Sequence, residues 1–160
     1  MRLFLQQETR TLTRPTYFVA DESGNILLRA KSRFLNILKK IDVTDEQLTK
    51  FACIAKTLSI VPKFKIDIHS QNAFIFYRKF SIHQDYEIRG RPLEVIRNVN
   101  NNFIITANGK KMANIQFQGD LAHSKYEINI SDGNAIIEYV CIILAMDLAN
   151  KMISRVQYRN

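Results

Sequence analysis

The fold is decided by the segment AIIEYVCIILAMDLANKM, residues 135–152, which contains neither Gly nor Pro. A largely apolar stretch of this length without a helix-breaking residue predicts an α-helix at about residues 134–152. Before residue 150 its only charged residues are Glu138 and Asp147, which are nine positions apart and therefore on opposite sides of a helix. A helix that has no polar face is either buried on all sides or spans a membrane.

Burial inside the protein fits this segment better than a membrane span. Crossing a bilayer takes about 20 consecutive apolar residues, whereas only eight residues separate Glu138 from Asp147. We therefore expect no transmembrane span and interpret the segment as a core helix. Its nine large apolar side chains are the expected core positions: Ile136, Ile137, Tyr139, Val140, Ile142, Ile143, Leu144, Met146 and Leu148.

The sequence before this helix repeats a unit in which apolar and polar residues alternate, a polar turn follows, and a second apolar run returns. Alternation such as FKIDIH (residues 64–69) or YEINIS (residues 126–131) is typical of half-buried strands. The dipeptide Asn108-Gly109 is the strongest turn signal, because both residues accept positive φ. Copies of the unit begin near Tyr17, Ile41, Phe64, Tyr86, Phe103 and Tyr126.

The repeat predicts about twelve strands: one near residues 3–8, five hairpins, and a last strand at residues 126–130. A sheet of consecutive hairpins this long usually closes, because closure removes exposed edges. Twelve strands make a barrel wider than its own side chains can fill. The sequence therefore predicts a mainly β fold, a closed, roughly 12-stranded antiparallel barrel around the buried C-terminal helix, as a single domain over residues 1–160.

Composition limits the class of protein without giving a function. A hydrophobic fraction of 46% and a charged fraction of 24% are those of a globular protein. Cys53 and Cys141 lie in apolar runs with no neighbouring metal-ligand residue, so we expect buried free thiols. The first ten residues hold too short an apolar stretch for a secretory signal, and we expect a cytoplasmic protein.

No motif for nucleotide binding, metal binding or nucleophilic catalysis occurs in the sequence. His69, His83 and His123 are far apart and are expected at the surface. Glu138 and Asp147 would be about 13 Å apart along the helix, too far to share a proton. Each is expected to reach one mouth of the barrel or to pair with a lysine or arginine there. We predict no catalytic residue, no metal site and no cofactor.

The net charge of +8 comes from basic residues scattered as singles and pairs. Arg89 and Arg91 flank one turn and Lys110 and Lys111 follow another, and turns of successive hairpins are expected at the same rim. Dispersed solubilising charge is one interpretation. The other is an anion-binding rim for phospholipid headgroups or for the acidic patch of a protein partner. Aromatic residues beside these cations are sparse, which makes nucleic acid an unlikely partner.

Five quoted units carry a family resemblance: YFVADESGNILLRA, IDVTDEQLTKFACIAK, FKIDIHSQNAFIFYRKF, FIITANGKKMANIQF and YEINISDGN, in that order before the apolar segment. Their order resembles the LURP-one-related proteins of the tubby C-terminal-domain-like superfamily, which include many small bacterial members. The resemblance implies a twelve-stranded barrel around a buried hydrophobic helix, and it implies no catalytic residues. Tubby proteins bind phosphoinositides through surface basic residues, and phospholipid scramblases are related in fold. None of those basic positions matches this sequence one by one, so no binding site is carried over.

Two hypotheses of function stay open at this point. The first is a non-enzymatic binding module that recognises an anionic phospholipid or a protein partner. The second is a scramblase-like lipid handler, or an enzyme, whose site is formed by residues of the rim. Nucleic-acid binding is a weaker third hypothesis, and it predicts strong, salt-dependent retention on DNA.

Overall fold

The computed structural model describes residues 1–8, 15–33, 40–69, 71–79, 86–98, 102–120, 123–131 and 133–157, with side chains up to residue 153. Its strands are β1 (Arg2–Glu8), β2 (Thr16–Asp21), β3 (Ile26–Ser32), β4 (Lys40–Thr44), β5 (Lys50–Lys56), β6 (Lys63–Ile68), β7 (Phe74–Arg78), β8 (Tyr86–Arg89), β9 (Leu93–Arg97), β10 (Asn102–Ala107), β11 (Lys110–Phe117) and β12 (Lys125–Ile130). A 3₁₀ turn (Gly133–Ala135) leads into the helix α1 (Ile136–Gln157).

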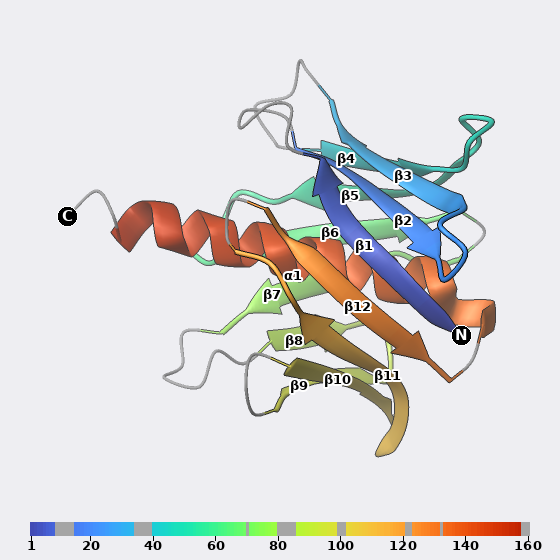
Figure 1. Cartoon of the computed structure of the whole chain (residues 1–160). Helices are drawn as coiled ribbons and strands as arrows, with labels where there is room; N and C mark the ends of the chain where they lie inside the picture. Colours follow the sequence, from blue (N-terminus) through green and yellow to red (C-terminus); the bar gives the residue numbers. More distant parts are fainter. Residues whose placement is uncertain are drawn as a thin grey trace.

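All twelve strands belong to one antiparallel sheet that curls around α1 (Figure 1). The sheet order is β8-β7-β6-β5-β4-β3-β2-β1-β12-β11-β10-β9. The first strand, β1, pairs with the last strand, β12, and Leu3 lies opposite Ile128. β8 and β9 follow each other in the chain but are the two edges of the sheet. The predicted twelve-stranded antiparallel barrel with a C-terminal helix is confirmed, and it is nearly closed, with one seam between β8 and β9.

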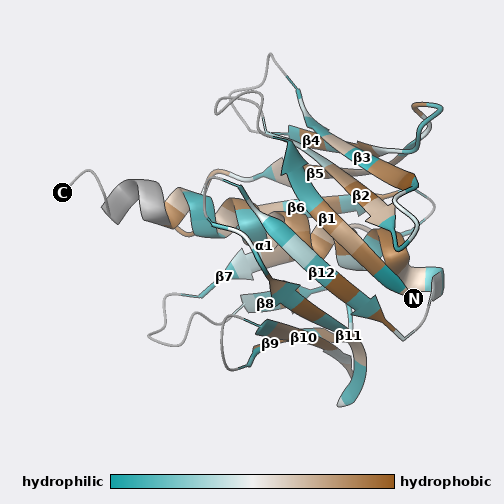
Figure 2. Ribbon diagram, viewed as in Figure 1, coloured by the Kyte–Doolittle hydropathy of each residue, from teal (hydrophilic) through white to brown (hydrophobic). Residues whose placement is uncertain are grey.

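The strands form where the sequence alternates, because alternate side chains reach the core. In β6, Phe64, Ile66 and Ile68 are buried while Lys65 and Asp67 are exposed. The strand that opens each repeat begins within one residue of its predicted start. Figure 2 shows the result as hydrophobic and hydrophilic residues alternating along the strands, with a hydrophobic stretch of α1 inside the sheet.

The helix passes through the barrel and protrudes at one end (Figure 1). Of the nine predicted core positions, six are buried and three, Ile136, Ile137 and Leu148, are half-buried against the same core. α1 continues to Gln157, beyond the expected end near residue 152, since neither Gly nor Pro interrupts it. Within the described residues, no helix combines the length and the apolar content that crossing a membrane requires.

The two ends of the barrel differ in their connections. At the end where α1 begins, which we call the helix-start end, the even-numbered strands run into tight turns such as Gly90–Pro92 and Asn108–Gly109. Three strand pairs change register next to this end, at Val19/Ala20, Val43/Thr44 and Ile105/Thr106. Such bulges increase local twist and are common at barrel rims. The opposite end, where α1 leaves the barrel, is the helix-exit end and carries the β5–β6 loop, residues 57–62.

Candidate functional site

The structure places the four cations singled out from the sequence at the helix-start end, as expected, but in different environments. Arg89 projects from the wall of the barrel, where its guanidinium lies 2.9 Å from the carboxylate of Glu87 and 4.8 Å from the centre of the Tyr77 ring. The hydrogen bonds from Tyr77 and then from Arg89 lower the pKa of Glu87 to about 2. The charge of Arg89 is therefore compensated locally.

Arg91 holds the start of the helix in place. Its Nε lies 2.7 Å from the Glu138 carboxylate, and its side chain is only 18% exposed. One terminal nitrogen donates to the side chain of Gln71 and to the backbone carbonyl of Asn72, both at 2.9 Å. Arg91 thus joins α1 to two turns of the barrel and has little capacity left for an external anion.

Lys110 and Lys111 are the two cations of the predicted rim that stay free. Both are exposed, and within the described part of the chain neither has an ion-pair partner. They follow a tight turn in which Asn108 and Gly109 have φ of 50° and 75°, as the Asn-Gly signal predicts. Anion binding at this rim remains a prediction, and it now depends on these two lysines.

The second helix carboxylate, Asp147, is buried at 2% exposure and is fully engaged. It accepts hydrogen bonds from Tyr17 (2.6 Å), Ser124 (2.5 Å) and Tyr126 (2.9 Å), and it pairs with Lys151 at 2.7 Å. Burial and then the Asp147 charge raise the pKa of Tyr126 well above its usual value. This cluster fastens the helix to β2 and β12. Both helix acids pair with a basic side chain, as the sequence predicted.

The residues that the structure describes form neither a candidate metal site nor an exposed reactive thiol. His69 and His123 are exposed and far apart, and His83 lies outside the described residues. No group of three histidine, cysteine, aspartate or glutamate side chains in the described ranges could hold a metal ion. Cys141 is buried, Cys53 is half-buried, and burial raises the pKa of both thiols.

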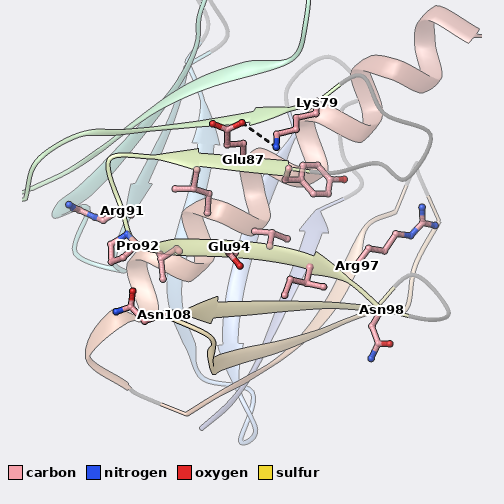
Figure 3. Close-up of a pocket in the computed structure, with 13 residues that line it drawn as sticks. Lys79, Glu87, Arg91, Pro92, Glu94, Arg97, Asn98 and Asn108 are labelled. Atoms are coloured by element: carbon pink, nitrogen blue, oxygen red, sulfur yellow. Dashed lines mark ion pairs between the residues drawn. The ribbon is translucent and has the colours of Figure 1, made fainter.

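A cavity of about 930 Å³ lies along the seam and is lined by β8, β9 and a few neighbouring side chains (Figure 3). Its rim carries charges of both signs. Lys79 pairs with Glu87 at 3.4 Å, while Glu94 and Arg97 project from β9. Because the charges alternate, the seam concentrates neither positive nor negative potential, and it offers no convergent set of catalytic groups.

The hairpin of β5 and β6 at the helix-exit end has a more one-sided character. Lys56 ends β5, Lys63 begins β6, and Lys65 follows on the outer face. No ion-pair partner is present for these three lysines among the described residues. The loop between them exposes two large apolar side chains, Leu58 and Ile60. The sequence predicted the strands here but did not indicate this hairpin as a binding site.

The opposite end of the barrel is acidic over the neighbouring hairpins. The β2–β3 turn carries Asp21 and Glu22, and the β4–β5 turn carries Asp45 and Glu46. These acidic turns lie at the helix-start end of the sheet, whereas Lys56 and Lys63 lie at the helix-exit end of β5 and β6. A surface of negative charge would attract the lysines of the β5–β6 hairpin and repel these two acidic turns.

Comparison with known proteins agrees with the fold. Residues 1–147, which include all twelve strands and α1 as far as Asp147, match the family model described as LURP-one-related. No curated protein and no solved structure matches the chain.

Proposed function

Because this chain belongs to the LURP-one-related family, whose tubby-like barrels are generally non-catalytic, we propose that it is a non-enzymatic module that binds anionic phospholipid surfaces. Binding takes place at the helix-exit end, and the whole chain acts as one unit. The observation that carries the proposal is the cluster of Lys56, Lys63 and Lys65 on a single hairpin, away from the acidic turns and without an ion-pair partner in the described part of the chain.

The charge balance of this hairpin suits a headgroup layer. A lysine close to an anionic membrane contributes about 1 kcal/mol of binding free energy. Long lysine side chains also keep their ammonium groups in the phosphate layer while their methylene stems contact less polar surroundings. The cytoplasmic leaflet is the anionic face of a cell membrane, so the proposal places the protein in the cytoplasm. The half-buried thiol of Cys53 is compatible with that reducing compartment.

Vesicle co-sedimentation tests the proposal with two variants of equal net charge. Lys63→Gln/Lys65→Gln removes two cations from the β5–β6 hairpin, and Lys110→Gln/Lys111→Gln removes two from the helix-start rim. The first variant should bind vesicles containing phosphatidylserine about 30-fold more weakly than the wild type, because two lysines are lost. The second should bind like the wild type.

Three results would count against this assignment. Equal binding of the wild type to neutral and anionic vesicles removes the electrostatic basis. A loss confined to the Lys110→Gln/Lys111→Gln variant transfers the site to the rim predicted from the sequence. Tighter, salt-dependent retention on DNA than on anionic vesicles favours nucleic acid as the partner.

A further inference from the structure

We propose that the β5–β6 loop enters the bilayer, with Leu58 and Ile60 as the inserted side chains. The inference rests on the proposed function, since it specifies how the same end of the barrel holds a lipid surface. Leu58 is 89% exposed and Ile60 is 97% exposed. Three other large apolar side chains of the described residues are exposed, and they are dispersed: Met1, Leu48 and Ile96.

The exposure of these two side chains is imposed by a well-anchored loop. At its base the Thr57 backbone N–H donates to the Lys63 carbonyl at 2.9 Å, which continues the hairpin. At its far side the Pro62 carbonyl accepts a 3.1 Å hydrogen bond from the Arg78 N–H, and Pro62 itself is buried. Because the loop is fixed at both ends, less of the chain has to be ordered on binding, which lowers the entropic cost of association.

The loop is also linked to the helix through Arg78. Arg78, whose N–H holds Pro62, donates through its guanidinium to the side chain of Asn150 at 3.2 Å. The hydroxyl of Tyr86 donates to the same oxygen at 2.7 Å. These bonds connect the base of the loop to β7, β8 and the last buried turn of α1. The loop is therefore attached to the hydrogen-bonded core of the barrel.

Charge and hydrophobicity are arranged in the order that a membrane interface requires. The apolar tip, with only Ser59 between its two large residues, stands beyond the strand ends that carry Lys56 and Lys63. A six-residue loop can reach the boundary between headgroups and acyl chains, which is where interfacial apolar side chains are buried. At that depth the lysines lie among the lipid phosphates. A protein groove would favour the apolar tip but gives no reason for the lysines around it, which have no ion-pair partner among the residues described.

The first experiment removes the apolar tip without changing the charge. Leu58→Ser/Ile60→Ser should weaken binding to phosphatidylserine-containing vesicles at least tenfold, because each side chain loses its transfer from water. The matched control is Leu48→Ser, a 70% exposed leucine in a turn at the helix-start end, which should leave binding unchanged. The two altered side chains make up none of the core, so both proteins should unfold at the wild-type temperature.

The second experiment locates the tip directly. In a Cys53→Ser background, Ser59→Cys is labelled with an environment-sensitive fluorophore and mixed with anionic vesicles. We expect a blue shift and quenching by lipids brominated in the acyl chain. Bound protein with neither change would overturn the insertion and leave the electrostatic proposal intact, whereas absence of wild-type binding overturns both. A change of oligomeric state in Leu58→Ser/Ile60→Ser, with vesicle binding retained, would identify the tip as a self-association surface and overturn the inference.

Discussion

The hydroxyl of Tyr17 donates a 2.6 Å hydrogen bond to the carboxylate of Asp147, across 130 positions of the chain. The bond connects the second strand to the middle of the C-terminal helix. Lys151 is part of the same cluster, since its ammonium group contacts Asp147, Tyr17 and the side-chain oxygen of Gln7. Asp147 thus helps to fix the rotation of α1 within the barrel, together with the bonds of Glu138 and Asn150.

Replacing Asp147 with Ala should be among the most destabilising changes in the protein. It leaves a mostly buried lysine without its counter-charge and the hydroxyls of Tyr17, Ser124 and Tyr126 without their acceptor. The expected loss is about 3–5 kcal/mol of unfolding free energy, measured by urea denaturation. The double variant Asp147→Ala/Lys151→Ala should lose less than the sum of the two single variants. Additive losses would show that the two groups are not coupled.

Arg91 and Arg89, two residues apart, should respond very differently to replacement by alanine. Arg91 is largely buried and joins Glu138 to two turns, so Arg91→Ala should cost about 1.5–3 kcal/mol, the range for hydrogen bonds to charged groups. Arg89 makes a solvent-exposed pair, and Arg89→Ala should leave the unfolding free energy close to that of the wild type. Thermal and urea unfolding of both variants check this, and similar losses would contradict the assigned roles.

The contacts of Glu87 should make the unfolding free energy depend on pH in the acidic range. Hydrogen bonds, first from Tyr77 and then from Arg89, lower its pKa from 4.5 to about 2. Because the folded-state pKa is the lower one, this stabilisation is fully present above about pH 4.5 and is lost as the pH falls through about 2. Carbon NMR titration of the Glu87 carboxyl should show the low pKa in the wild type and a higher one in Tyr77→Phe. A wild-type value near 4.5 would contradict the contact.

The buried part of the helix should tolerate no charge. Ile143 is completely buried, so Ile143→Asp places an unpaired carboxylate in the core, where isolated charges are very costly. We expect a chain that is insoluble or that lacks near-ultraviolet circular dichroism while binding a hydrophobic dye. Ile153→Asp, on the part of α1 near its outer end, is the control and should remain folded. A sharp thermal transition in Ile143→Asp would refute a helix enclosed by the sheet.

The hairpins and the helix could be predicted because each depends on a local pattern. Alternation in FKIDIH, the Asn108-Gly109 turn and the apolar run after residue 134 are all properties of neighbouring residues. The seam could not be predicted in this way. Whether β8 pairs with β9 depends on how twist accumulates over the whole sheet, and the short connection Gly90–Pro92 looks like an ordinary hairpin turn.

The candidate site escaped prediction for a related reason. Leu58 and Ile60 have the same even-numbered register as the buried Ala52 and Ile54, with Lys56 between them, so in the sequence they resemble inward-facing strand positions. In the structure β5 ends at Lys56, so Leu58 and Ile60 lie in the following loop and their side chains are exposed to solvent. The partner of Arg91 could not be predicted from its neighbours either. Its place beside a turn made it a candidate for the anion-binding rim, whereas the structure pairs it with Glu138, 47 positions further along the chain.

The seam has a consequence for dissecting the molecule. A cut in the Gly90–Pro92 connection would separate β1–β8 from β9–β12 and α1 without interrupting a single hydrogen-bonded strand pair. The two polypeptides would still share the pairing of β1 with β12 and the packing of α1 against β5, β6 and β7. Co-expressed halves should therefore reassemble, which makes this barrel a natural split scaffold whose division point is already present in its architecture.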